Sequence, residues 1–438
     1  MLRILSREPV FHSIFTIGHN RDDVNQVAPE LPKRRRLEHV DAMRPVKQAG
    51  VISTHVLDVF APQTAGQGAA LTLLHVSREA FFFVSACMLT YTYTSLKRSG
   101  LPRFYWRRFV SVGIPYLCWT VIYYLYTFRE SHYAGTHQAL MALPDLLYLS
   151  YYHLYFLLVI MQFYLVFPLV LMGLRRFKRY HRLIIAAAAV IQVLLVIAMH
   201  WGWLPVYMSG LWAQKEAPTY VLYLIGGCVA AFHLDKVDAW LRRHARLVVA
   251  LTALAAMLAV GVFLLAWYGV TTVLGSGTDP FQPSVIPFNL GAIACLYLVG
   301  TALVRNGRTR KLARIGSDNS YGIYLSQMLF ISPLVWLGWA RLDGTVPWPL
   351  LCLVTIPAVY LAGFGLTTLL ARTPLAVPLT GRPRVALALP TPWTGLLDWR
   401  ERSQRRSATT LGAPGRSLAW PVRKVKSGGG QSSPSRLG

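Results

Sequence analysis

The chain has 438 residues, of which 54% are hydrophobic and only 14% are charged, and its formal net charge is +26. Because soluble domains carry about 25% charged residues, this composition excludes an ordinary soluble enzyme and indicates a polytopic membrane protein. The excess of Lys and Arg does not indicate a nucleic-acid binder, since these residues lie in short loops and in the two tails rather than in a separate basic module. We interpret them as topology signals and as contacts for anionic lipid heads.

Residues 1–40 are polar, end in the basic run 33–36, and lack the long apolar core of a cleavable signal peptide. We expect them to form a disordered, basic cytoplasmic arm. At the other end, residues 373–438 are rich in Pro, Gly, Ser and Arg and are expected to form a disordered, basic cytoplasmic tail. The transmembrane domain is then predicted to occupy residues 41–372.

Apolar runs fill the region between the arm and the tail, and each is close to the roughly 20 residues that a bilayer requires. The first run is the least apolar and would be missed by hydropathy alone; we include it for its position and for the topology that it completes. The sequence therefore predicts an all-α membrane protein with about ten transmembrane helices, near residues 45–63, 78–96, 109–128, 153–173, 183–202, 219–233, 247–270, 285–304, 320–340 and 347–371.

The distribution of Lys and Arg among the loops supports this even count. The loops after the second, fourth, sixth and eighth spans carry four or five cations each, whereas the intervening loops carry one or none. An extra or missing helix would break this alternation. By the positive-inside rule, the alternation places both termini in the cytoplasm.

Cysteine usage points to no special chemistry. The five cysteines lie singly in apolar runs, their number is odd, and the sequence has no CxxC pair. We therefore expect neither a disulfide framework nor a bound metal. Buried cysteines of this kind usually act as small hydrophobic residues.

The first span carries a cation, Arg44, and an imidazole, His55, inside an otherwise apolar stretch. Eleven residues separate them, which puts both on one face of a helix, roughly 16 Å apart along its axis. Such groups are unfavourable at membrane depth and favour a functional site. Asp58 lies three residues further on, where it can orient the imidazole as a general base. The alternative, given similar weight, is a snorkelling arginine with a buried histidine bonded to a backbone carbonyl.

Three other places carry polar residues, each with two interpretations. At the outer end of the second span, Arg78 and Glu79 bind a polar acceptor or form a structural ion pair with another helix. At the cytoplasmic entrance to the third span, Arg107 and Arg108 grip a nucleotide phosphate or anchor the helix in the membrane surface. At the outer end of the fourth span, His153 contacts an extracellular substrate or sits in an aromatic belt.

The motifs occur in an order that is informative as a set. They are Arg44-x10-His55, an aromatic-Val-Ser element at 81–85, Arg107-Arg108-Phe109 with Pro115-Tyr116, His153-Leu-Tyr-Phe with the run from Gln162 to Pro168, and Ser320-Tyr-Gly-Ile-Tyr-Leu325. Together they cover most of residues 38–382. In this order the chain resembles acyltransferase family 3, whose integral membrane proteins O-acylate sugars, cell-wall polymers and secondary metabolites.

The resemblance implies acyl-CoA as a co-substrate on the cytoplasmic side, with no permanently bound cofactor, and an acceptor hydroxyl reached from the membrane or the outer face. It also implies that Arg44 helps to hold the donor and that His55 acts at the reacting centre. From charge and side we add Arg107 or Arg108 for the donor phosphates, and Asp58 or Glu79 to orient His55. Arg78 and His153 are expected near the acceptor.

Three departures from the family pattern stand out: Ser85-Ala86 in place of Ser-Gly, Tyr155 in place of Trp, and Gln327 in place of a histidine. The third removes a possible second titratable group. We expect Gln327 to be buried among helices and residues 317–320 to cap the start of the ninth span.

The sequence thus predicts a multi-pass O-acyltransferase of the cell membrane that moves an acyl group, in the first place acetyl, to a carbohydrate, cell-envelope glycan or glycosylated metabolite. The main alternative is a transporter or exporter of a polysaccharide precursor, and a scaffold of an envelope assembly complex is a second. Against transport, the chain shows no internal repeat and no matched pair of interrupted helices.

Overall fold

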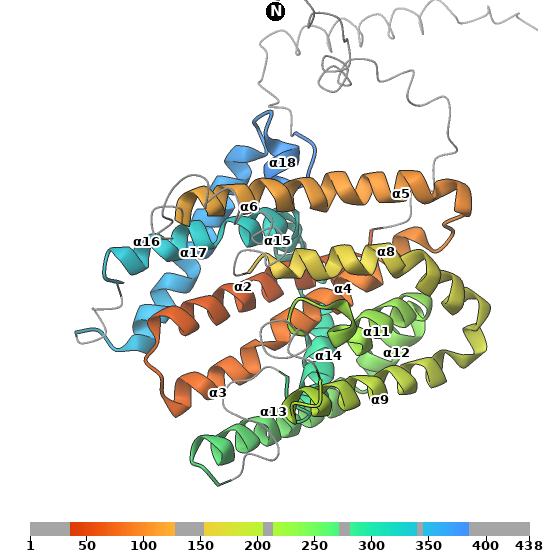
Figure 1. The fold of residues 1–438 in the computed structure, drawn as a ribbon, viewed down its shortest axis with the longest axis horizontal. Helices are drawn as coiled ribbons and strands as arrows, with labels where there is room; N and C mark the ends of the chain where they lie inside the picture. The colour runs from red at the N-terminus through yellow and green to blue at the C-terminus, as the bar shows by residue number, and fades with distance from the viewer. Residues whose placement is uncertain (1–35, 128–152, 205–212, 271–280, 340–344, 385–438) are drawn as a thin grey trace, which may run out of the picture. The chain divides into compact units, whose positions relative to one another are not determined.

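The computed structural model describes residues 36–127, 153–204, 213–270, 281–339 and 345–384. Helices and short turns account for these residues, and no β-strand occurs among them (Figure 1). Most of the predicted arm and tail lies outside the described residues. The all-helical fold class is confirmed for the part of the chain that the structure describes.

Seven helical segments of the described chain are long and apolar enough to cross a membrane, and a bent pair adds an eighth if it counts as one span. In that pair α11 (Val221–Phe232) is followed by α12 (Leu234–Arg243) at a bend of 98°. The seven are Ala65–Tyr93, Arg98–Tyr126, Tyr155–Arg176, Lys178–His200, Ala245–Trp267, Val285–Leu303 and Trp348–Leu370.

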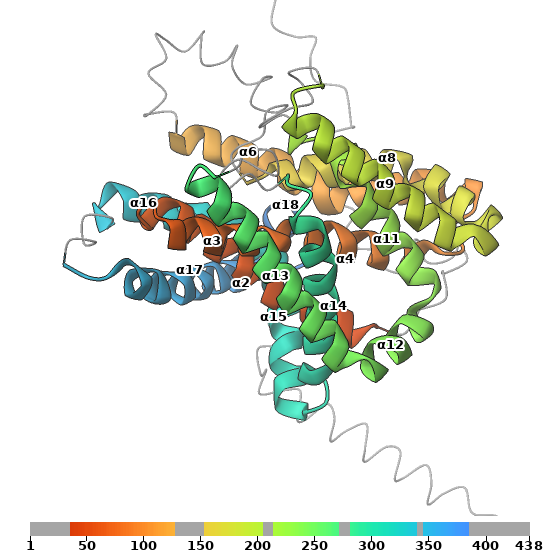
Figure 2. The same cartoon turned by 90° about the horizontal axis from the view of Figure 1, so that it is seen from below.

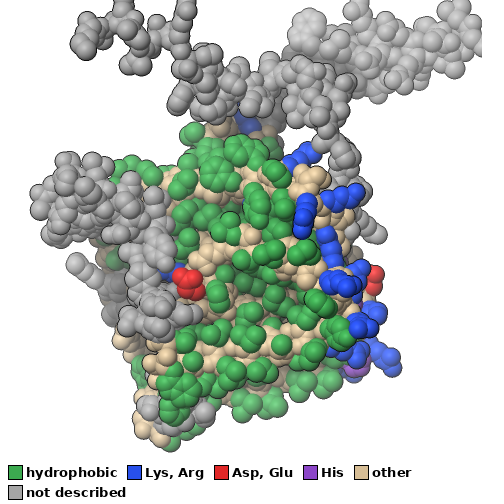
Figure 3. Space-filling view, turned by 45° about the vertical axis from the view of Figure 1, so that its right-hand side comes forward, with side chains coloured by type: hydrophobic (Ala, Val, Ile, Leu, Met, Phe, Trp, Pro, Cys, Tyr) green, Lys and Arg blue, Asp and Glu red, His purple; other side chains and the backbone are tan. Residues whose placement is uncertain are grey.

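Every one of the ten predicted spans overlaps helix among the described residues. The first corresponds to α2 (Glu38–Phe60), which does not pass as a span by hydropathy. The ninth covers the end of α15 (Gly307–Ser326) and all of α16 (Met328–Trp336). The count of ten and the cytoplasmic position of the termini remain predictions. Figure 3 shows Lys and Arg side chains gathered along one side of the described residues, with hydrophobic side chains over much of the remaining surface.

The polar helix α2 lies in the middle of the bundle. It packs against α3 (Ala65–Leu74), α4 (Val76–Tyr93), α14 (Val285–Leu303), α15 and α17 (Trp348–Leu370) (Figures 1 and 2). Its acidic first turn suits the positive end of the helix dipole. Because neighbours cover it on several sides, its polar residues Lys47 and Gln48 are buried against protein instead of lipid. This placement explains how a helix of low hydropathy can occupy a membrane domain.

The third predicted span is interrupted close to its start. α5 (Leu101–Arg108) passes through a π-helical turn at Phe109–Gly113 into α6 (Ile114–Thr127). Pro115 supplies a local cause, because it has no N–H to bond the carbonyl of Ser111. Such wide turns often accompany functional sites.

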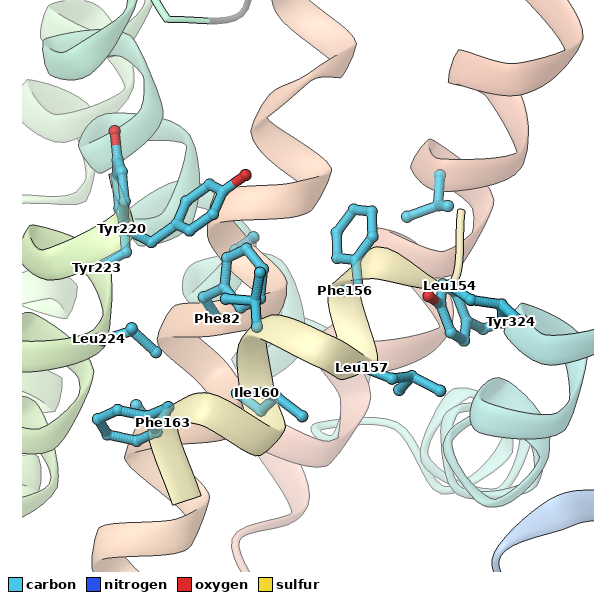
Figure 4. Close-up of a cluster of buried hydrophobic side chains, with 14 of the residues drawn as sticks. Phe82, Leu154, Phe156, Leu157, Ile160, Phe163, Tyr220, Tyr223, Leu224 and Tyr324 are labelled. Carbon is cyan, nitrogen blue, oxygen red and sulfur yellow. The ribbon is translucent and has the colours of Figure 1, made fainter. Parts of the chain in front are cut away.

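A well-packed aromatic core holds α4, α8 and α11 together. α8 (Tyr155–Arg176) directs Phe156, Ile160 and Phe163 toward α4 and α11, as Figure 4 shows. The ring of Phe82 on α4 stacks on Phe156, with centroids 5.6 Å apart, and lies 4.3 Å from the ring of Tyr220, which precedes α11. These contacts fix the relative positions of the helices that carry the polar motifs.

Two element boundaries differ from the sequence prediction. α15 does not begin at residues 317–320; it starts at Gly307, where the side chain of Asn306 accepts a hydrogen bond from the Arg308 N–H and caps the helix. The predicted tail contains α18 (Ala376–Thr380), a short helix that packs against α6, α15 and α17. The remaining helices are α9 (His181–His200), α13 (Ala245–Trp267) and α16 (Met328–Trp336).

Candidate active site

The polar stripe of α2 opens into two separate cavities. Arg44, Lys47 and Gln48 line one of them, toward the start of the helix. His55 and Asp58 line the other, toward its end. We call the first the basic cavity and the second the histidine cavity.

The basic cavity measures about 400 Å³ and gathers cations from different parts of the chain. Four of its described lining residues are Lys or Arg, and no described lining residue is Asp or Glu. Its other polar side chains carry hydroxyl groups, apart from the amide of Gln48. The polar lining residues are Arg44, Lys47, Gln48, Ser85, Arg108, Ser111, Tyr164, Ser320, Tyr321, Tyr324 and Arg382.

Neighbouring groups hold these cations in place. The Nε atom of Arg44 lies 3.6 Å from a carboxylate oxygen of Asp41, and the Nζ atom of Lys47 lies 4.2 Å from the centre of the Phe81 ring. Arg108 packs over the rings of Tyr93 and Tyr164 and donates a hydrogen bond to the Tyr93 hydroxyl. Held in this way, the cations form a preorganised site for an anion.

The histidine cavity measures about 270 Å³ and has a different chemistry. Asp58 is exposed and His55 is half-buried, one helical turn apart on the same wall. A carboxylate in this position can orient an imidazole and stabilise its protonated form. The described lining residues are Val51, Thr54, His55, Asp58, Leu71, Leu74, His75, Ser77, Arg78, Tyr155, Phe156 and Gln214.

A layer of three aromatic side chains, Phe81, Phe156 and Tyr324, stands between the cavities. Their ring centroids are 5.7 Å apart for Phe81 and Phe156, 6.1 Å for Phe81 and Tyr324, and 5.9 Å for Phe156 and Tyr324. The two cavities share no described lining residue, yet α2, α4 and α8 each line both. Phe81 and Tyr324 line the basic cavity and Phe156 lines the histidine cavity, so the linings of the two cavities meet at this aromatic layer.

His153 is enclosed by protein next to His55. It is fully buried, with its ring centroid 6.1 Å from that of His55 and 5.3 Å from those of Tyr123 and Tyr324. The Tyr324 hydroxyl donates a hydrogen bond to the backbone carbonyl of His153. Since His153 does not line the histidine cavity, these contacts favour support of His55 over direct contact with an external substrate.

Arg78 and Glu79 form an ion pair with each other, whereas the structural alternative expected a pair with another helix. One carboxylate oxygen of Glu79 accepts hydrogen bonds from the Nε and Nη2 atoms of Arg78. Both side chains are buried, and the guanidinium lies over the rings of Tyr220 and Phe281. Arg78 lines the histidine cavity and Glu79 does not, so Asp58 is better placed than Glu79 to orient His55.

The structure separates the two neighbouring arginines at the start of the third span. Arg108 lines the basic cavity, whereas Arg107 is exposed and lies outside its lining. Sequence reasoning missed Lys47 and Arg382. Lys47 follows Arg44 by three residues and could have been found from helical periodicity. Arg382 lies in the predicted tail, where no sequence pattern pointed to a site.

Gln327 is buried, as expected, and has an identified partner. Its side-chain oxygen accepts a hydrogen bond of 3.2 Å from the Nε2 atom of Gln48, which lines the basic cavity. The amide at the family's histidine position therefore links α2 to the junction of α15 and α16.

Comparison with known protein families matches residues 39–367 to an acyltransferase domain. The chain belongs to acyltransferase family 3. The match covers about three quarters of the sequence. It includes nearly all of α2 with His55, and all three residues of the aromatic layer. No curated protein and no solved structure matches the chain. Family membership supports a multi-pass membrane transferase, and Arg382 lies beyond the matched residues.

Proposed function

We propose that this acyltransferase family 3 protein transfers an acyl group, in the first place acetyl, from acyl-CoA to a hydroxyl of a carbohydrate, cell-envelope glycan or glycosylated metabolite. The observation that carries this proposal is the pairing of two unlike cavities along one helix. A cavity with four cations and no described carboxylate suits the phosphates of coenzyme A. A cavity with an imidazole beside a carboxylate suits a hydroxyl that must lose its proton.

The donor would lie along α2. Its phosphates would contact Arg44, Lys47 and Arg108 in the basic cavity, on the side that the positive-inside rule assigns to the cytoplasm. Its extended arm would pass the aromatic layer toward His55. Arg44 and His55 are roughly 16 Å apart along the helix, a separation that a long extended donor can span.

In the proposed reaction, the acceptor hydroxyl enters the histidine cavity and attacks the carbonyl carbon of the thioester. His55 accepts the hydroxyl proton as the new C–O bond forms, and Asp58 stabilises the imidazolium. The C–S bond then breaks, and the departing thiolate takes the proton from His55. A route through an acyl-histidine gives the same products and remains an alternative. The small volume of the histidine cavity favours a short acyl group.

The test supplies labelled acetyl-CoA and a panel of glycans and natural products to membranes that contain the protein. We expect a labelled product with the wild type and with His244→Ala, a control remote from both cavities. His55→Ala should lower turnover by about 10²–10⁴-fold at an equal protein level, since a general base typically contributes this much. Near-normal turnover in His55→Ala would reject its assignment. Movement of a substrate across the membrane with the thioester intact would favour the transporter alternative.

A further inference from the structure

We propose that Arg382, on the turn after α18, is a phosphate-binding residue for the acyl donor, supplied from beyond the matched family domain. This inference rests on the proposed function, because it concerns the donor of that reaction. It assigns binding to a segment that the sequence alone placed in a disordered, basic tail.

The turn that carries Arg382 is anchored in the bundle. Ala376 and Thr380 of α18 are buried, and the indole N–H of Trp119 on α6 donates a hydrogen bond of 2.9 Å to the Leu379 carbonyl. Gly381 ends the helix with φ +65°, and a Cβ there would collide with the Ser111 carbonyl and the Tyr321 ring. Only glycine fits this position. The chain is thus led past two residues of the basic cavity wall immediately before Arg382.

The side chain of Arg382 is held at the cavity without losing its charge. Its Nη1 atom lies 3.2 Å from a carboxylate oxygen of Asp318, and its Nη2 atom donates to the Ser317 carbonyl. Asp318 also pairs with Arg36, at 2.9 Å. Arg36 also pairs with Asp41, which lies 3.6 Å from Arg44, so two carboxylates serve three guanidinium groups and a net positive charge remains at the basic cavity.

Other residues of the basic cavity wall carry polar atoms that lack partners. Within the described part of the chain, neither the buried hydroxyl of Tyr321 nor the Nε atom of Arg108 has a hydrogen-bond partner. Buried polar atoms are normally satisfied. A phosphate placed between Arg382, Arg108 and Tyr321 would accept hydrogen bonds from all three, and charge-assisted bonds of this kind are the strong ones.

A purely structural role for Arg382, which would tie the end of the chain to α15 through Asp318, makes a different prediction. Loss of a structural tie would lower the amount of folded protein and affect all donors alike. Loss of a phosphate contact would weaken only donors that carry phosphate. The decisive measurement is therefore a comparison of two donors that share the thioester and differ in phosphate content.

The experiment uses the full chain in membranes and compares acetyl-CoA with acetyl-pantetheine, which has no phosphate. We expect Arg382→Gln to raise the KM for acetyl-CoA about tenfold or more, with little change in kcat and no change in the KM for acetyl-pantetheine. Arg382→Lys should recover part of the loss. The control is Arg384→Gln, an exposed arginine two residues further on whose Nε atom donates to the Arg372 carbonyl; both donors should behave as with the wild type.

A second measurement separates this inference from the proposed reaction. Coenzyme A alone should raise the thermal unfolding midpoint of the detergent-solubilised wild type, and should raise that of Arg382→Gln less. Stabilisation by coenzyme A without any acylated product would refute the proposed reaction and leave the binding role standing. The inference would be overturned if Arg382→Gln raised the KM for both donors equally. It would also be overturned if the variant changed neither KM and was stabilised by coenzyme A as much as the wild type.

Discussion

At the scale of single residues, the proposed reaction centre gives different roles to the carboxylates of Asp58 and Glu79. Asp58 lines the histidine cavity together with His55, whereas Glu79 is buried and bonded to Arg78. Substitution of the two carboxylates should therefore have different effects. A change at Asp58 should lower turnover, and a change at Glu79 should lower the stability of the fold.

Asp58→Asn should lower turnover about tenfold or more, because the amide cannot stabilise a protonated imidazole. The amount of folded protein should stay close to that of the wild type, since Asp58 is exposed. The measurement is the rate of labelled product per amount of protein in membranes. Unchanged turnover would leave His55 without a carboxylate partner and favour the alternative of a structural histidine.

Glu79→Leu should destabilise the protein by about 3–5 kcal/mol, because it leaves the buried guanidinium of Arg78 without its counter-ion. The double variant Arg78→Met with Glu79→Leu should be more stable than the single variant, since it removes both charges. Thermal unfolding in detergent measures both. A single variant as stable as the wild type would show that water reaches this pair.

Residue positions on α2 were predictable, and those on α5 were not. Helical periodicity placed Arg44 and His55 on one face, and the structure has them on one stripe that opens into two cavities. Arg107 and Arg108 carry the same charge, and adjacent residues differ by about 100° around a helix. Which of the two points inward depends on the packing of α5 against α8, and no local pattern records that.

At the scale of elements, the aromatic layer lies between the basic cavity, which we propose for the donor, and the histidine cavity, which we propose for the acceptor. Phe81 belongs to α4, Phe156 to α8 and Tyr324 to α15, so the layer exists only when the three helices are packed together. A layer of this kind restricts the passage of water between the cavities and protects a thioester from hydrolysis.

Phe81→Ala should open the layer and raise the rate of acetyl-CoA hydrolysis without acceptor several-fold, while lowering the yield of acylated product per thioester consumed. The measurement is release of free thiol in the absence and presence of acceptor. Phe83→Ala, at a neighbouring position of α4 that lines neither the basic nor the histidine cavity, is the matched control. Equal thiol release from both variants would argue against a barrier at Phe81.

The sequence predicted the long elements well because their apolar runs are continuous. It misplaced the start of α15, because polar residues at 317–320 resemble a cap while the helix is already under way from Gly307. It also missed α18, since five residues held by tertiary contacts with α6, α15 and α17 have no periodicity of their own. Both errors come from packing that joins distant parts of the chain.

At the scale of the whole molecule, the one-sided distribution of Lys and Arg predicts the orientation in the membrane (Figure 3). In a background without the five native cysteines, Lys215→Cys should react with an impermeant maleimide in intact cells. Lys236→Cys, in a loop predicted to be cytoplasmic, should react only after the membrane is permeabilised. Labelling of both in intact cells would refute the predicted topology and the even count of spans.

An ion cluster ties the beginning of α2 to α15 and to the segment after α18. Partial burial would raise the pKa of Asp318, but hydrogen bonds from Arg36 and Arg382 outweigh it and hold the pKa below its ordinary value. The lowered pKa means that this cluster stabilises the fold above the ordinary pKa of an aspartate, near 3.9, and stops doing so as the pH falls through the lowered value. We expect the difference in unfolding midpoint between wild type and Asp318→Asn to shrink as the pH falls below about 5 and through the lowered pKa of Asp318. A constant difference would show that Asp318 acts through contacts that do not depend on its charge.

The central position of α2 has a consequence for biogenesis. This helix leaves the ribosome well before α14, α15 and α17, which pack against it and begin only at Val285. Until they arrive, Lys47 and Gln48 must face lipid, water or an insertion chaperone. In a chain that ends before these helices, Lys47 and Gln48 therefore stay uncovered and can act as a degradation signal. Substitutions in α14, α15 and α17 that touch no substrate should reduce the quantity of protein in the cell before they reduce the activity of each molecule.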